Sequence, residues 1–205
     1  MASREPTLDQ ALVNAPLHEQ VDGLEAALAQ SIPVGRILAD AVKLSLPNWY
    51  LGASGVSQTV WNQLHGFAPA EAIKDYDIVY FDATDLSVEA ERAIEEQAAE
   101  LFADLRITLD VKNEARVHLW YAERYGRTIV PYTCTEDAIA TWPTTASSVG
   151  VRYDDGRFVV CAPFGLRDIF AMVARPNKAI VSQEVCHEKV QRWASRWPQL
   201  TVIPW

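Results

Sequence analysis

Cysteine is scarce in this chain, and the little present is not arranged for a structural role. The 205 residues include four histidines and three cysteines, Cys134, Cys161 and Cys186. An odd number of cysteines with no Cys-x-x-Cys spacing argues against a disulfide framework, and neither residue type has the spacing of zinc ligands. We therefore expect free thiols in a reducing compartment, which makes a cytoplasmic location the simplest interpretation.

Long apolar runs are also missing from the sequence. No stretch approaches the roughly 20 consecutive apolar residues of a membrane-spanning helix. The N-terminal segment MASREPTLDQALVNAPLHEQ lacks the basic-then-apolar pattern of a secretory signal. There is no internal repeat and no low-complexity segment. These absences favour a globular protein with no membrane partner.

Basic residues are outnumbered by acidic ones. The chain has 18 Lys and Arg against 27 Asp and Glu, for a formal net charge of −9. Such a chain gains nothing overall from the counterion release that drives binding to polynucleotides. The charge therefore disfavours a long nucleic acid as partner, whereas a nucleotide can bring magnesium with its phosphates. The sequence does not determine the oligomeric state.

Within these limits, the sequence predicts a single domain, residues 1–205, of α+β class. Hydrophobic residues make up 49% of the chain, which allows a sizeable core. Expected helices lie at residues 17–30, 33–45, 56–66, 88–103, 113–126, 135–142, 163–173 and 182–196. Expected strands lie at 49–51, 78–82 and 106–111, followed by a hairpin over 147–163.

This order of elements favours a mixed β-sheet with flanking helices and an α/β-like core. We expect a catalytic core over about 45–125 and accessory elements in the C-terminal third. Residues 1–16 are predicted to be a loose arm.

Two aspartates stand at the start of the second expected strand. Lys74-Asp75-Tyr76-Asp77 leads into the strand at Ile78, and if the strand extends back through Asp75, both carboxylates lie on one face. Carboxylates held that close repel each other unless a cation lies between them. Magnesium suits such a place, since it prefers one or two carboxylates together with substrate phosphate oxygens. For an isolated Asp-x-Asp, however, a solvated pair at a strand start is the commoner case.

A third acidic residue, Asp110, lies in the next expected strand. The intervening helix allows that strand to pair beside 78–82, which would bring Asp110 to Asp75 and Asp77. Three carboxylates can hold two metal ions about 4 Å apart and so clamp the attacking and leaving oxygens of a phosphoryl transfer. Asp110 is placed to accept a proton from the attacking hydroxyl. We predict these three residues as the catalytic and metal-binding set, with two Mg²⁺ ions.

A turn of small residues, Gly52-Ala53-Ser54-Gly55, joins the first expected strand to a helix. Small side chains let backbone N–H groups approach a phosphate closely, and the start of a helix favours negative charge. Because Ser54 and Ser57 add hydroxyl donors, the four turn residues and Ser57 form our predicted nucleotide-binding set. An ordinary tight turn is the alternative. A serine-hydrolase elbow is disfavoured, because valine stands where that motif needs its second glycine.

Two cations follow Asp110 closely in the sequence. Lys112 and Arg116 could contact a phosphate or the acceptor, or pair with the aspartates. They could equally form surface ion pairs with Glu114 or its neighbours. Both are included in the predicted nucleotide-binding set.

The order of these features resembles the DNA polymerase beta-type nucleotidyltransferase superfamily. More closely, the chain is similar to a bacterial nucleotidyltransferase-like family, over roughly residues 47–178. The similar runs are NWYLGA, TVWNQLHG, KDYDIVYFD, DLSVEAE, LDVKNEARVHLWY, DAIATWP, SSVGVR, APFGLRDIF and RPN. The resemblance implies a mixed sheet with helices, magnesium and a nucleoside triphosphate. It does not name the acceptor substrate.

The chain departs from this family in the turn. The family usually has Gly at position 54, then Arg and Asn at positions 57 and 58, where this chain has Ser54, Ser57 and Gln58. The missing Arg removes a charge that could contact the triphosphate or brace the acidic pair. One hypothesis is magnesium-dependent transfer of a nucleoside monophosphate from a nucleoside triphosphate to a small-molecule acceptor, with release of pyrophosphate. The alternative is a non-catalytic binding or interaction protein of the same fold.

Overall fold

A computed structural model describes residues 10–205, and it has the mixed α+β architecture that the sequence predicts. One sheet has five strands in the order β3-β2-β1-β4-β5. Its strands are β1 (Tyr50–Gly52), β2 (Tyr76–Tyr80), β3 (Leu109–Asn113), β4 (Gly150–Asp154) and β5 (Arg157–Cys161). Since β2 and β3 are parallel and the other neighbours antiparallel, the sheet is mixed.

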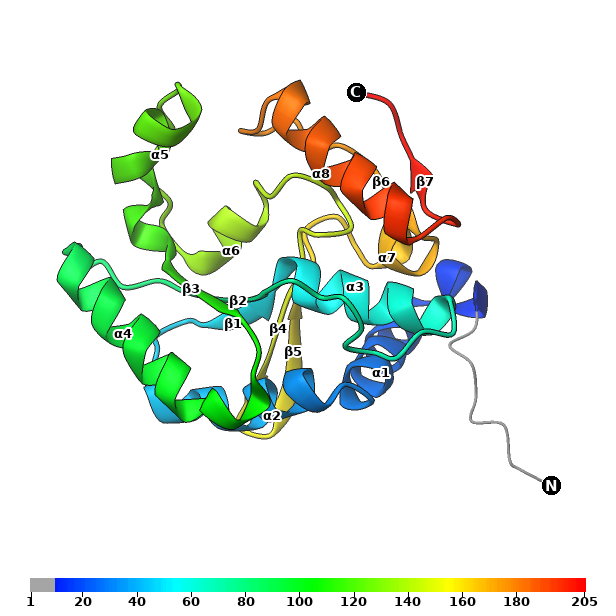
Figure 1. The fold of residues 1–205 in the computed structure, drawn as a ribbon, viewed down its shortest axis with the longest axis horizontal. Coiled ribbons are helices and arrows are strands. Elements are labelled where there is room, and N and C mark those ends of the chain that lie inside the picture. The colour runs from blue at the N-terminus through cyan, green and yellow to red at the C-terminus, as the bar shows by residue number, and fades with distance from the viewer. Residues whose placement is uncertain (1–9) are drawn as a thin grey trace.

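Helices cover both faces of this sheet. They are α1 (Leu17–Ala29), α2 (Ile32–Asp40), α3 (Ala53–Leu64), α4 (Val88–Leu101), α5 (Val117–Tyr125), α6 (Thr135–Ile139), α7 (Arg167–Phe170) and α8 (Gln183–Arg196). Short 3₁₀ helices are η1 (Gln10–Asn14), η2 (Ala41–Leu44), η3 (Ala103–Leu105) and η4 (Glu114–Arg116). In Figure 1, α2 and α4 lie below the sheet, and α6 and α8 lie above it. Among residues 10–205, no helix is both long and apolar enough to cross a membrane.

Local signals explain where several elements begin and end. The Ser87 hydroxyl accepts a hydrogen bond from the Ala90 N–H and so caps α4. Gly126 ends α5 with a left-handed φ of 72°. The β4–β5 turn holds Asp155 and Gly156 at φ values of 47° and 75°, which are the positive values that tight hairpin turns favour. These boundaries follow from the sequence because each depends on neighbouring residues alone.

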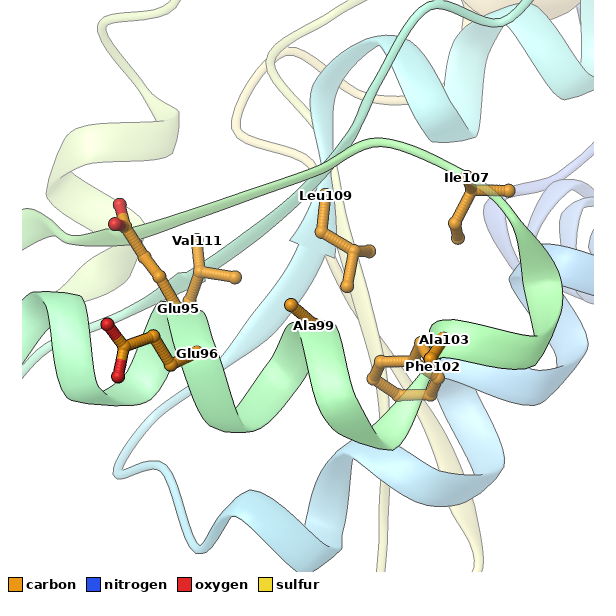
Figure 2. Close-up of a pocket in the computed structure, with 8 residues that line it drawn as sticks. All are labelled: Glu95, Glu96, Ala99, Phe102, Ala103, Ile107, Leu109 and Val111. Carbon is orange, nitrogen blue, oxygen red and sulfur yellow. The ribbon is translucent and has the colours of Figure 1, made fainter.

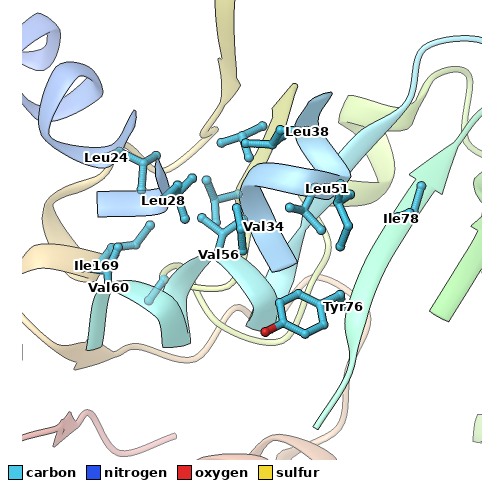
Figure 3. Packing of buried hydrophobic residues seen from close by; sticks show 14 of the residues in the cluster. Leu24, Leu28, Val34, Leu38, Leu51, Val56, Val60, Tyr76, Ile78 and Ile169 are labelled. Carbon is cyan, nitrogen blue, oxygen red and sulfur yellow. The ribbon is translucent and has the colours of Figure 1, made fainter. Parts of the chain in front are cut away.

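The main core lies between the first three helices and the sheet. Figure 3 shows Leu24 and Leu28 of α1 beside Val34 of α2, all fully buried. Leu51 of β1 and Ile78 of β2 face the same cluster. Burial of each such side chain contributes about 1.5–3 kcal/mol to folding. The helices that precede β1 in the chain are therefore packing elements, as their sequence pattern indicates.

Aromatic side chains hold α8 against α3. Trp193 of α8 and Trp197 just after it meet Trp61 of α3 edge-on, with ring centroids 5.2 Å and 5.5 Å away. The Trp197 indole N–H donates to the Asn62 side-chain oxygen at 3.0 Å. All three indoles are almost fully buried. This cluster fixes one wall of the site described below.

Two expectations about the extent of the elements change. Residues 10–14, expected in a loose arm, form η1, and Leu12 packs on the core; residues 1–9 of that arm lie outside the described residues. The β4–β5 hairpin pairs with β1, so the sheet extends beyond the expected core of 45–125.

The helix expected over 163–173 is confined to α7. Gly165 and Met172 take positive φ values of 71° and 53° on either side of it, so the helix cannot extend in either direction. The chain then enters β6 (Val173–Ala174), which pairs in parallel with β7 (Thr201–Val202).

Candidate active site

The pairing of three strands brings two of the predicted acidic residues side by side. Asp77 of β2 lies in register with Gly52 of β1 on one side and with Asp110 of β3 on the other. Residues paired across strands point to the same face of a sheet, so both carboxylates lie on the face where Gly52 has no side chain. Asp75 precedes β2 by one residue and lies outside the strand.

A cavity of about 370 Å³ opens beside Asp75 and Asp77. One wall comes from α3 and the other from α8, so we call it the α3–α8 cavity. Its polar lining includes Ser54, Gln58, Lys189 and Arg192 in addition to the two aspartates. The acidic residues are therefore open to a small molecule.

Asp77 is partly enclosed and has other acids as neighbours. Burial raises its pKa to about 7, and the charges of Asp75 and Asp110 add to the rise. Lys189 and the backbone N–H of Ser54 act in the opposite direction by stabilising the carboxylate. Because burial and the two acids together outweigh these two groups, a further cation placed beside Asp77 would be stabilising.

Asp110 already has a cation beside it. Its side chain is 47% exposed, and its carboxylate lies 3.0 Å from the Lys112 ammonium. Lys112 also contacts Glu95 at 2.7 Å. Although burial lowers the pKa of Lys112, these two carboxylates together hold it above its ordinary value. Lys112 is thus a charge partner of Asp110, which is one of the two roles that its position in the sequence allows.

The acidic side chains suit magnesium but do not already surround an ion. Within residues 10–205, no three His, Cys, Asp or Glu side chains are placed to hold one metal together. Lys112 forms an ion pair with the Asp110 carboxylate. Binding of a metal ion by all three aspartates therefore requires that ion pair to break. The donor chemistry fits, because Asp75, Asp77 and Asp110 offer the oxygen ligands that Mg²⁺ prefers and their charges repel one another without a cation.

The predicted nucleotide-binding turn is the start of a helix. β1 ends at Gly52, and α3 begins at Ala53, which takes a positive φ of 50°. The Ala53 N–H donates to the Val149 carbonyl at 3.0 Å. The Ser57 hydroxyl is fully buried and donates to the Ala53 carbonyl at 3.2 Å. Both groups are engaged inside the protein, so we correct the assignment of Ala53 and Ser57 as phosphate contacts.

The two glycines of this segment allow close packing. A Cβ atom at Gly52 would lie 2.5 Å from the Trp142 ring, and one at Gly55 would lie 3.0 Å from the Tyr76 ring. Of the predicted turn, Ser54 is the residue that lines the α3–α8 cavity in the part of the chain described. The nucleotide-binding prediction for this segment therefore narrows to Ser54.

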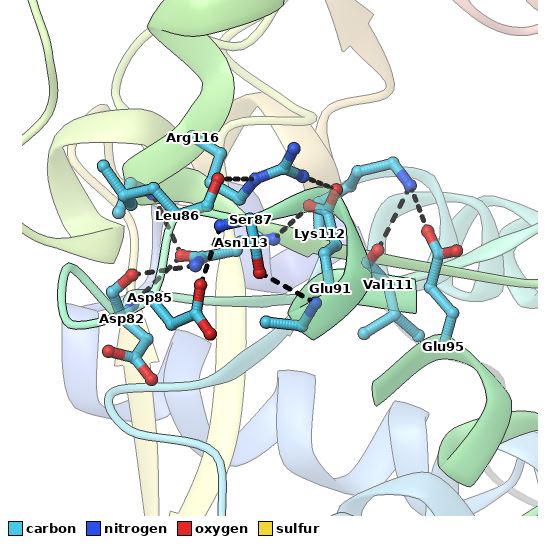
Figure 4. A network of polar contacts seen from close by, with 12 residues as sticks. Asp82, Asp85, Leu86, Ser87, Glu91, Glu95, Val111, Lys112, Asn113 and Arg116 are labelled. Carbon is cyan, nitrogen blue, oxygen red and sulfur yellow. Dashed lines mark hydrogen bonds and ion pairs between the residues drawn. The ribbon is translucent and has the colours of Figure 1, made fainter. Parts of the chain in front are cut away.

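Arg116 requires a further correction. It is 5% exposed, forms an ion pair with Glu91 of α4, and donates from Nε to the Leu86 carbonyl at 2.9 Å. Figure 4 shows this network, in which Glu91 also accepts the Asn113 N–H at 2.9 Å. The guanidinium therefore ties α4 to the end of β3 and is not available to a nucleotide.

Glu114 belongs to the site although sequence analysis did not select it. The residue is 6% exposed, and no described residue hydrogen-bonds or ion-pairs with its carboxyl group. Burial raises its pKa to about 8, with Asp77, Glu91 and Asp110 adding to the rise. The signal was present in the spacing, because Asp110, Lys112 and Glu114 alternate as residues on one face of a strand do.

A second cavity, of about 240 Å³, reaches the acidic residues through Asp110 and Glu114. Its lining is largely aromatic, so we call it the aromatic cavity. The aromatic residues are Trp120, Tyr121, Tyr125, Tyr132 and Trp142. Two cavities of different character therefore border the paired strands, one at Asp77 of β2 and the other at Asp110 of β3.

A larger cavity of about 440 Å³ lies elsewhere, between α4 and β3 (Figure 2). Leu109 and Val111 of β3 face Ala99 of α4 and Phe102 just after that helix across it. Since side chains alternate along a strand, these two residues point away from the face that carries Asp110. We therefore do not assign the chemistry to this cavity.

Comparison with known proteins agrees with this geometry. A family model described as nucleotidyltransferase matches residues 39–202. A search among curated proteins finds no match. A solved NMR structure, described as revealing a CCA-adding enzyme head domain, is similar with a TM-score of 0.73 and 25% sequence identity. The similarity covers 94% of this chain and 100% of that one.

Proposed function

The chain belongs to the nucleotidyltransferase family that matches residues 39–202, and on that basis we propose that it transfers a nucleoside monophosphate from a nucleoside triphosphate to a small-molecule acceptor. The observation that carries the proposal is the register of Asp77 with Asp110, since each of these acids lines a cavity of its own. Neighbouring carboxylates can hold the metal ions that clamp the attacking and leaving oxygens of an in-line phosphoryl transfer.

The reaction exchanges one bond at phosphorus for another. A hydroxyl, phosphate or amine of the acceptor bonds to the α-phosphorus, and the bond from that phosphorus to the bridging oxygen breaks, so that pyrophosphate leaves. Asp110 accepts the proton that the acceptor loses, since its side chain is 47% exposed and its ion pair among residues 10–205 is with Lys112. The Ser54 N–H and Lys189 favour the ionised form of Asp77.

Magnesium is part of this proposal. Asp75, Asp77 and Asp110 would hold it, and when bound it neutralises phosphate charge and orients the reacting oxygens. The raised pKa of Asp77, which reflects burial and its acidic neighbours, supports a cation at this place.

Two properties of the molecule support a small acceptor. The α3–α8 cavity, of about 370 Å³, falls in the lower part of the range of small-molecule sites, roughly 300–1,000 Å³, and the aromatic cavity adds about 240 Å³. The net charge of −9 opposes the approach of a polynucleotide.

The alternative is a protein of this fold that binds nucleotide without turnover. The closed ion pair between Asp110 and Lys112 and the uncharged Ser57 favour it. Calorimetric titration with nucleotides, with and without magnesium, separates the two hypotheses. Binding that does not depend on magnesium and releases no pyrophosphate would support the alternative.

The decisive experiment replaces Asp77 by Asn. We expect pyrophosphate release from nucleoside triphosphates and pooled metabolites to fall by about 100-fold or more, with the fold retained, because the amide keeps the shape but removes the charge. The matched control is Asp155→Asn, in the exposed β4–β5 turn, which should leave the rate unchanged. Equal rates in Asp77→Asn and in the unmodified protein would refute the assignment.

A further inference from the structure

Helix α8 presents a row of cations to the α3–α8 cavity. Lys189, Arg192 and Arg196 follow one another at spacings of three and four residues, which place them on one side of the helix. All three line the cavity, and Lys74 lines it from the segment before β2. In a chain with a net charge of −9, this concentration of positive charge is local.

Two of these four cations have no carboxylate partner. Arg196 forms an ion pair with Glu71, and Lys74 lies 3.8 Å from a carboxylate oxygen of Asp75. Among the described residues, none forms an ion pair with Lys189 or Arg192. Two positive charges therefore face the cavity without an ion-pair partner among residues 10–205.

Desolvation of the Lys189 ammonium costs free energy that a bound anion would offset. Its ammonium lies 5.2 Å from the centre of the Trp193 ring, and that ring belongs to the aromatic cluster that docks α8. Burial lowers the pKa of Lys189, while Asp77 and Asp75 act to raise it. A buried ammonium normally pairs with an anionic group. An anion bound in the cavity would supply such a partner for Lys189.

We propose that Lys189 and Arg192 bind the triphosphate group of the nucleotide in the α3–α8 cavity. This inference deepens the proposed function and rests on it for the identity of the substrate. Ammonium and guanidinium groups form short, charge-assisted hydrogen bonds with phosphate oxygens. Ser54, at the start of α3, lines the opposite wall. The arrangement places the polyphosphate beside Asp77 and leaves the aromatic cavity for the acceptor.

Binding of inorganic tripolyphosphate tests the proposal without any need for turnover. We expect calorimetric titration at low salt, with and without magnesium, to show binding that Lys189→Met and Arg192→Met each weaken by about tenfold or more. Lys189→Arg should bind within a few-fold of the unmodified protein, because the charge is kept. The control is Lys178→Met, an exposed lysine that packs over Trp205, for which we expect no change.

A purely structural role for Lys189 predicts different results. If the ammonium served only to stabilise the fold, Lys189→Met would lower the unfolding temperature and leave tripolyphosphate binding unchanged. We expect tripolyphosphate binding to fall in Lys189→Met whether the unfolding temperature rises through relief of desolvation or falls through loss of the charge that stabilises Asp77. Equal binding by the Lys189→Met/Arg192→Met double variant, or no binding under either condition, would overturn the proposal.

The test separates this inference from the proposed function. Tripolyphosphate binding that is lost in the double variant but kept in Asp77→Asn, with no pyrophosphate from any nucleotide, would support the subsite and refute the activity. Pyrophosphate release with an unchanged KM for the nucleotide in the double variant would support the activity and refute the subsite.

Discussion

Buried charged residues in this protein are of two kinds, those with a compensating partner and those beside like charges. Arg116 and Glu91 are buried as partners, with Asn113 sharing the carboxylate, so their charges are compensated. Asp77 and Glu114 are buried beside other acids, and the pKa of each is raised. Compensated charges of the first kind hold a scaffold together, whereas uncompensated ones of the second kind are typical of sites that bind a ligand or ion.

Replacement of Arg116 by Met tests the first use. The variant leaves Glu91 buried without its partner, and we expect the free energy of unfolding to fall by about 3–5 kcal/mol. Urea denaturation followed by circular dichroism measures it. The Arg116→Met/Glu91→Gln double variant should recover much of the loss, because a neutral side chain then faces the buried site. A stable Arg116→Met protein with weakened nucleotide binding would restore the role first predicted for this arginine.

At the scale of elements, the junction of β1 with α3 decides the shape of the site. Gly52 lies in register with Asp77 and also with Gly150 of β4, so the sheet lacks side chains at two successive positions on one side of the acid. The Trp142 ring fills the space over Gly52 and lines the aromatic cavity. The glycine therefore permits the approach of an aromatic wall to the sheet.

Substitution of Gly52 by Ala should disturb this junction. The new Cβ would lie 2.5 Å from Trp142, and we expect a loss of about 1–3 kcal/mol in the free energy of unfolding together with reduced turnover. Gly35→Ala is the matched control, since nothing lies within 4 Å of its Cβ and it sits inside α2. That control should stabilise the protein by up to about 1 kcal/mol. Thermal unfolding of both variants measures these changes in stability. Equal stability of the two would contradict the packing argument.

At the scale of the molecule, the site is assembled from distant parts of the chain. β1, β2 and β3 provide the sheet face, α3 and α8 enclose one cavity, and α5 with the segment after α6 encloses the other. Positive charge gathers in the α3–α8 cavity although the whole chain carries −9. This separation favours a compact anion such as a triphosphate over an extended polyanion.

A polynucleotide should therefore bind weakly or not at all. We expect a labelled RNA hairpin to show a dissociation constant weaker than about 100 µM at physiological salt, because the overall charge repels it. Fluorescence anisotropy measures the binding, and a nucleoside triphosphate with magnesium serves as the positive control by calorimetry. Micromolar binding of the hairpin, or its extension at the 3′ end, would contradict the small-acceptor proposal.

The sequence by itself determined the elements and the pairing that matters most. Periodicity and local signals such as the Ser87 cap and the Asp155-Gly156 turn act over a few residues, so they can be read without a structure. The helix between Asp77 and Asp110 indicated that their strands could be neighbours, and β2 and β3 do pair at these residues. The roles proposed for these acids remain predictions.

Only the tertiary structure decided which side chains face the site. Arg116 and Ser57 looked available in the sequence, but they are buried by α4 and by the turns of α3 itself. Lys189 carried no distinctive motif and Glu114 only its alternation with Asp110 and Lys112, yet packing brings both to Asp77. Burial and the position of α8 depend on contacts between segments more than 100 residues apart, such as Trp61 with Trp193, and a local pattern does not encode those contacts.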